Sequence, residues 1–163
     1  MIIDDARVAK MIADLLRAGL PEGCPLLWPE DPDPDNTGGA PRPLWWVRMR
    51  LPEIDDGPGA GTVGGAAGRN ELLFVCEIVV TPELDTPLAV GTLIGHVRRA
   101  LSNRNTSDTA THHHLQLLGA EGRPDRSPEN PRDLRGGAVR VRGYASRTQG
   151  DTPTVPLTAV TNP

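Results

Sequence analysis

The most constraining feature of this chain is an apolar segment from Glu71 to Val80. It is rich in β-branched residues, and Gly68 and Pro82 stand close to its two ends. A short, near-continuous apolar run between turn residues is typical of a buried strand. We therefore predict that this segment is a central strand covered on both faces.

A second strand is predicted from Leu44 to Leu51, where the side chains alternate with a period of two. The face that we expect to be buried carries Trp45, Val47, Met49 and Leu51. Three shorter segments have similar but weaker patterns. They are Cys24–Trp28, His112–Leu118 and Ala138–Ala145.

Two segments have apolar residues at helical spacing. The first runs from Asp4 to Arg17, begins with acidic residues and is followed by Gly19. The second begins with Thr86 as the expected N-cap and Pro87 as the first helical residue. The apolar stripe of the second helix consists of Val90, Leu93, Ile94, Val97 and Leu101.

The remaining segments are rich in Gly and Pro, of which the chain has 18 and 17. We expect loops at 29–43 and 119–137 and a flexible loop at 52–70. The order of elements predicts an α+β fold: a mostly antiparallel sheet of about four to five strands, two helices packed against it and long polar loops. We assign residues 1–146 to a single domain and residues 147–163 to an extended C-terminal tail.

Composition narrows the range of functions. The net charge is −4, so no basic face for nucleic-acid binding is indicated. Aromatic residues make up only 3% of the chain. A core with so few large side chains compensates only a small part of the conformational entropy lost on folding. Contacts with further subunits would supply additional burial, which favours an oligomer. Lys10 is the only lysine, and either interface chemistry or GC-rich codon usage accounts for this bias.

Neither targeting nor cysteine chemistry is indicated. The residues after Met1 lack the charged and apolar regions of a signal peptide, and no apolar run is long enough to span a membrane. We therefore expect synthesis in the cytoplasm.

Cys24 and Cys76 lie among apolar residues without metal-ligand spacing, so we expect both to be buried free thiols.

Two motifs match known sites only in part. The glycines of 59–64 resemble a dinucleotide-binding loop, but they lie inside a Pro/Gly-rich loop and no helix follows. Asp31, Asp33 and Asp35 resemble the start of a calcium loop. That loop needs a Gly at its sharp turn and a bidentate Glu at its end, whereas this chain has Asn36 and Arg42 there.

Histidines are the remaining metal candidates. Alternation along a strand would place His112 and His114 on one face, and a metal shared between subunits at these two residues stays open. The chain has no nucleophile elbow and no cysteine in polar surroundings. We therefore predict no enzyme activity, no catalytic residue, no cofactor and no resident metal.

Taken in order, these elements resemble those of the tail terminator (tail completion) proteins of long-tailed bacteriophages and phage-like particles. The resemblance covers roughly residues 2–146 and depends on arrangement more than on any one motif. It consists of the N-terminal helix, the Trp28-Pro29 turn, the strand after Pro43, the Gly68-Arg69-Asn70 entry into the apolar strand and the helix that follows. Small head–tail joining proteins share much of this pattern.

The resemblance implies a structural virion protein located in the tail or neck. Its subunits would form a ring, expected to be a hexamer, that caps the tail tube, stops its polymerisation and joins the tail to the head connector. The implied partners are further copies of this chain, the tail tube protein and a connector or neck protein. Neither sequence-specific nucleic-acid binding nor a membrane is implied.

Charged residues are the candidates for contacts between subunits. We expect the acidic loop to meet arginines of a neighbouring subunit across the interface. The acidic candidates are Asp31, Asp33 and Asp35, and the basic ones are Arg48, Arg50, Arg140 and Arg142. Three alternatives stay open: another neck subunit, an oligomeric adaptor unrelated to phage, and a small enzyme with a site between subunits.

Overall fold

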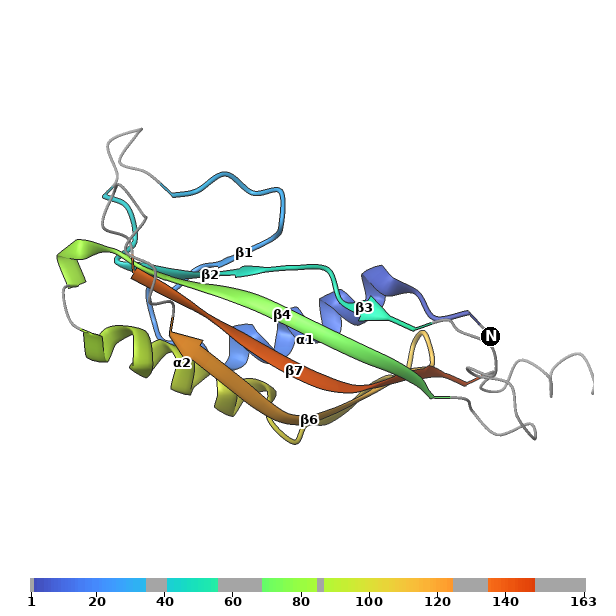
Figure 1. Cartoon of the computed structure of the whole chain (residues 1–163). Helices are drawn as coiled ribbons and strands as arrows, with labels where there is room; N and C mark the ends of the chain where they lie inside the picture. The colour runs from blue at the N-terminus through green and yellow to red at the C-terminus, as the bar shows by residue number, and fades with distance from the viewer. Residues whose placement is uncertain (1, 35–40, 56–68, 85–86, 125–134, 149–163) are drawn as a thin grey trace, which may run out of the picture.

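The computed structural model describes residues 2–34, 41–55, 69–84, 87–124 and 135–148. In these residues, two helices lie on one side of a long, twisted sheet (Figure 1). The helices are α1 (Asp5–Gly19) and α2 (Pro87–Leu101), with a short 3-10 helix, η3 (Pro82–Leu84), before α2. The strands are β1 (Leu26–Leu27), β2 (Trp45–Met49), β3 (Glu53–Ile54), β4 (Asn70–Val80), β5 (Asn105–Asp108), β6 (His113–Pro124) and β7 (Arg135–Arg147).

The sheet has seven strands in the order β1-β2-β4-β7-β6-β5, with β3 also pairing with β4. The α+β class is as predicted. The predicted strand at Cys24–Trp28 contains β1, but the expected number of about four to five is too low, because β3 and β5 are short pieces without a clear apolar alternation. The sheet is also mixed, since β1 pairs with β2 in parallel while the other described pairs are antiparallel.

Strand β4 is central, but the prediction that both of its faces are covered is wrong. Its even-numbered residues, such as Phe74 and Cys76, are fully buried, whereas Leu73, Val75 and Val79 are only partly buried. Both helices pack against the same side of the sheet, so among the described residues the opposite side lacks a second layer. The apolar run therefore marks a half-covered strand.

Strand β2 is confirmed, and its burial is more complex than predicted. Val47 and Met49 are fully buried beneath the helices, but Leu51 lies beyond the end of the strand and is 62% exposed. Trp46 is only 1% exposed although alternation places it on the side away from the helices. Arg48 projects to the same side and pairs there with Asp33, whereas the Trp28 ring packs against the core.

Strands β6 and β7 overturn the prediction of a polar loop at 119–137. Strand β6 continues to Pro124, and β7 already begins at Arg135, so only residues 125–134 fall outside the described structure. A glycine enables this packing: a Cβ on Gly122 would lie 2.3 Å from Cγ2 of Ile94 in α2. The hydrogen bonds between β6 and β7 join backbone groups and do not require apolar side chains. The polar composition of this segment therefore led to the wrong prediction of a loop.

The two helices agree with the sequence. Asp4 caps α1 and accepts a hydrogen bond from the N–H of Ala6 at 3.0 Å, and α2 begins at Pro87. Each residue of the predicted stripe on α2 is buried. Helix α1 includes Gly19, where a Cβ would lie 2.6 Å from Cβ of Ala100, so the glycine permits close packing of the helices.

Parts of the predicted loops cannot be compared. Residues 56–68, Thr86 as an N-cap and the tail from residue 149 onward lie outside the described residues. The ends of the predicted 52–70 loop are described, however, and they are strands. Glu53 and Ile54 form β3, and Asn70 begins β4.

Leu93→Asp should abolish folding. Leu93 is fully buried in the core, and an unpaired carboxylate there costs several kcal/mol, comparable to a whole-domain stability of about 5–15 kcal/mol. The matched control is Thr92→Asp, because Thr92 is the adjacent residue of α2 and is exposed. Urea unfolding and soluble yield should separate the two variants, and equal stability would contradict the placement of Leu93.

Candidate interaction surface

The side of the sheet that faces away from the helices is the most extensive candidate surface, and we call it the open face. Strand β4 contributes Leu73, Val75 and Val79 to it, all partly exposed. Arg142 of β7 lies opposite Leu73, and Arg140 lies opposite Val75. On the open face, apolar side chains of β4 thus lie directly beside arginines of β7.

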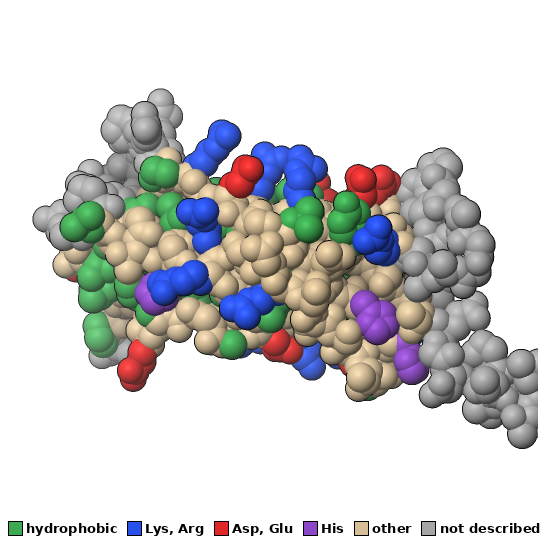
Figure 2. Space-filling view, turned by 90° about the horizontal axis from the view of Figure 1, so that it is seen from below, with side chains coloured by type: hydrophobic (Ala, Val, Ile, Leu, Met, Phe, Trp, Pro, Cys, Tyr) green, Lys and Arg blue, Asp and Glu red, His purple; other side chains and the backbone are tan. Residues whose placement is uncertain are grey.

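The charges on this face are distributed unevenly. Arg140 and Arg142 are exposed, and within the described residues neither makes an ion pair. Arg50, by contrast, donates to the Glu77 carboxylate at 2.6 Å. Figure 2, seen from below, shows Lys and Arg side chains among acidic, hydrophobic and other ones. Glu77 belongs to the open face as well, and Glu121 of β6 lies opposite Arg140, so this face combines apolar area with charges of both signs.

Arg48 and the acidic loop lie together within one chain. Arg48 Nη1 donates to the carbonyl oxygens of Trp28 at 3.0 Å and Asp31 at 2.6 Å, while Nη2 pairs with the Asp33 carboxylate. The Asp31 carboxylate in turn accepts from the N–H of Trp28 at 2.8 Å. Arg48 is only 16% exposed. The N–H groups of Arg48 therefore bind residues of its own chain, and we do not propose Arg48 as a contact residue. Asp35 lies outside the described residues.

Arg48→Ala should destabilise the protein more than Arg50→Ala. Arg48 makes several hydrogen bonds from a largely buried position, and losing hydrogen bonds to a charged group costs about 1.5–3 kcal/mol. Arg50 makes one exposed ion pair, for which about 0–1 kcal/mol is expected. Urea unfolding of both variants measures the difference, and a larger loss for Arg50→Ala would refute the anchoring role of Arg48.

The three consecutive histidines have different roles. His112 has a positive φ of 60° and precedes β6, so the strand alternation that would pair it with His114 does not apply. His113 is buried. His114 Nδ1 lies 2.8 Å from Oγ of Ser107. Within the described residues, no group of three or more His, Cys, Asp or Glu residues is placed to hold a metal.

His113 joins the start of α1 to β6. Its Nε2 accepts a hydrogen bond from the N–H of Asp4 at 3.0 Å, and its Nδ1 lies 2.9 Å from Oγ1 of Thr111. Burial lowers the pKa of His113, and the nearby Arg147 lowers it further, although Asp4, Thr111 and Asp108 oppose this shift. A neutral ring is required, because a protonated Nε2 cannot accept the bond from Asp4.

This lowered pKa predicts a loss of stability in mildly acidic solution. An unfolded imidazole takes up a proton near pH 6.5, whereas His113 in the folded chain does so only at lower pH. The unfolded state therefore binds more protons below about pH 6.5, and the free energy of unfolding falls as the pH falls through this range.

His113→Gln should reduce this loss between pH 7.5 and pH 5.5, measured by urea unfolding at each pH. His114→Gln is the matched control and should keep the dependence of the wild type, because His114 is not buried in the same way. An equal acid-induced loss in wild type and His113→Gln would show that another group is responsible.

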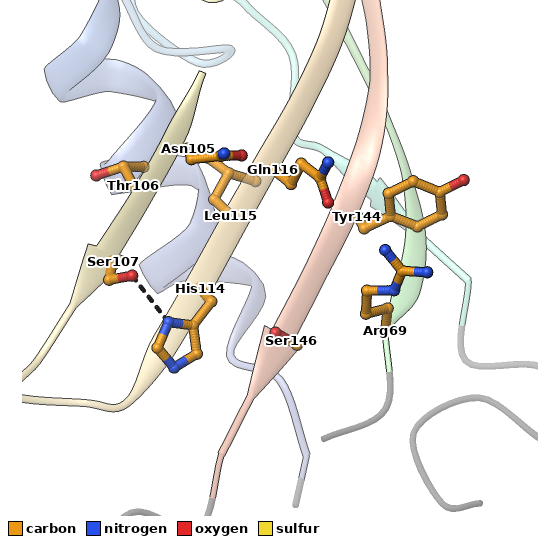
Figure 3. Close-up of a pocket in the computed structure, with 9 residues that line it drawn as sticks. All are labelled: Arg69, Asn105, Thr106, Ser107, His114, Leu115, Gln116, Tyr144 and Ser146. Atoms are coloured by element: carbon orange, nitrogen blue, oxygen red, sulfur yellow. Dashed lines mark hydrogen bonds between the residues drawn. The ribbon is translucent and has the colours of Figure 1, made fainter. Parts of the chain in front are cut away.

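A polar depression of about 390 Å³ lies at the β5 end of the open face. Figure 3 shows Arg69 beside Tyr144 on one side and the hydrogen-bonded pair of His114 and Ser107 on the other. The Arg69 guanidinium carbon lies 4.7 Å from the centre of the Tyr144 ring. Asn105, Gln116 and Ser146 complete the polar lining, with Thr106 and Leu115.

Sequence reasoning missed this depression, because its residues are contributed by β5, β6, β7 and the residue before β4. Only the register of the sheet brings them together. Arg69 belongs to the Gly-Arg-Asn entry to the apolar strand, but nothing in its sequence spacing indicates a contact with Tyr144.

The cysteines carry no reactive chemistry. Both are free thiols in buried positions, as predicted. Burial raises the pKa of Cys24 to about 12 and that of Cys76 to about 12. The thiolate, which is the nucleophilic form, is therefore scarcely populated near pH 7.

Comparison of the chain with models of known protein families and with curated proteins finds no match to either. No helix in the described part of the chain is long and apolar enough to cross a membrane. Function is therefore inferred from the surface and from the order of elements in the chain.

Proposed function

We propose that this chain is a structural virion protein: a subunit of a tail terminator ring that caps the tail tube, stops its polymerisation and joins the tail to the head connector. The observation that carries the proposal is the open face, where apolar residues of β4 and arginines of β7 lie side by side without a covering helix. The resemblance to tail terminators in the order of elements points to the same role.

The open face has the composition of a protein interface. Arg and aromatic residues are enriched in interfaces, and Lys is depleted. The open face has Arg140, Arg142 and Tyr144, and Lys10 lies elsewhere, on α1. Leu73, Val75 and Val79 of β4 are partly exposed there, which adds apolar area that a partner would bury.

The two edges of the sheet suit a ring. Strand β1 ends the sheet on one side and β5 on the other, and they differ in length and sequence. Contacts between unlike surfaces of identical subunits close into a ring when the rotation between neighbours closes. A ring bound to the tube end through one surface then blocks the addition of further tube subunits.

Charge reversal on the open face should weaken assembly without unfolding the chain. Arg140→Glu and Arg142→Glu alter exposed side chains, so melting temperatures should stay close to wild type. An unpaired charge in a desolvated interface weakens association by about 2–5 kcal/mol. Lys10→Glu makes the same charge change on an exposed residue of α1 and is the control.

The direct assay is polymerisation of the cognate tail tube protein, with tube lengths measured by electron microscopy. Added wild-type protein should cap tubes and shorten them, and the two open-face variants should do so less effectively than Lys10→Glu. Particles that lack the protein should have tubes of abnormal length and unjoined heads. Normal tube length with unjoined heads would favour another neck subunit, and intact infectious particles would refute the proposal.

A further inference from the structure

The depression beside Arg69 is the most elaborate polar feature among the described residues, and the proposed function does not yet use it. Its lining comes from strands at the β5 end of the sheet, on the open face. We propose that it receives the acidic segment around Glu30 of a second copy of this chain. This inference depends on the proposed function, because it assigns the contact that closes the proposed ring.

The lining favours a carboxylate. None of the described residues that line the depression is Asp or Glu, whereas Arg69 contributes a guanidinium, and Asn105 and Gln116 contribute amide groups. Ser107 and Ser146 add hydroxyl groups. Each of these groups can donate a hydrogen bond, and guanidinium groups bind carboxylates through paired donors.

The two most polar groups are held in place before a ligand arrives. The Tyr144 ring supports the Arg69 guanidinium, and the bond between Ser107 and His114 Nδ1 orients the imidazole. Figure 3 shows these two pairs at opposite sides of the depression. Side chains that are already ordered lose less conformational entropy on binding, so the site is prepared for a ligand.

The acidic segment has the complementary charge and the required position. Glu30 is exposed, and the Asp33 side chain is 71% exposed even though it pairs with Arg48. This segment follows β1, at the edge of the sheet opposite β5. Subunits arranged head to tail would bring the β1 edge of one chain to the β5 edge of the next.

The segment is also rigid enough to serve as a ligand. Arg48 holds the carbonyl oxygens of Trp28 and Asp31. The Arg17 guanidinium lies 5.9 Å from the centre of the Trp28 ring, which adds a contact from α1. Glu30, between these anchored residues, is therefore presented at a defined place on the surface.

The test is a charge swap read out by sedimentation velocity at low and moderate salt. Arg69→Glu and Glu30→Arg should each weaken self-association at least tenfold, and the double variant Arg69→Glu/Glu30→Arg should recover most of the loss. Lys10→Glu has the same charge change as Arg69→Glu and should associate like wild type. Arg69→Gln, which removes the charge without reversing it, should give an intermediate loss, and circular dichroism should show that every variant is folded.

Several results would overturn the inference. If Arg69→Glu and Glu30→Arg associate as strongly as wild type, the ring can still form, but this contact is not part of it. A double variant no better than the single ones would show that the two residues do not meet. Acetate or inorganic phosphate that shifts the His114 ring signals in the monomer, without any effect of Arg69→Glu on assembly, would identify a small-anion site only. A wild-type chain that stays monomeric alone and with tube protein would refute both the contact and the proposed ring.

Discussion

The structure depends on one constraint: both helices pack against the same side of the sheet. Strand β4 pairs with β7 along its whole length, and its buried residues Leu72, Phe74, Cys76 and Ile78 meet the apolar stripes of the helices. Burial of apolar area on this side supplies most of the driving force for folding. The same arrangement leaves the other side of the sheet with partly exposed Leu73, Val75 and Val79.

The remaining surface features follow from this asymmetry. At the β1 end, Arg48 holds the Trp28 carbonyl oxygen and the Asp33 carboxylate, and Trp46 is buried on the side away from the helices. At the β5 end the side stays open, and the donors around Arg69 form a depression. One end of the open face is therefore acidic and the other lined with donors, a polarity that suits contacts between unlike surfaces of identical subunits.

Sequence alone predicted the elements that depend on local chemistry. The acidic start of α1, Pro87 as a helix start and the stripe of α2 follow from helix geometry, and they are confirmed. The predictions that were wrong concern features set by tertiary packing. These are whether one or both faces of β4 are covered, and how far β6 extends past Gly119. The site was the least accessible, since Arg69, Ser107, His114 and Tyr144 meet only through strand register.

The central claim is that the open face of the sheet is a contact surface in an assembled ring. Electron microscopy of the purified chain with tail tube protein, at a resolution that places the strands, tests it most directly. We expect a closed ring on the tube end, with Arg140 and Arg142 facing a neighbouring protein. A monomer, or a ring in which the open face is exposed to solvent, would contradict the claim.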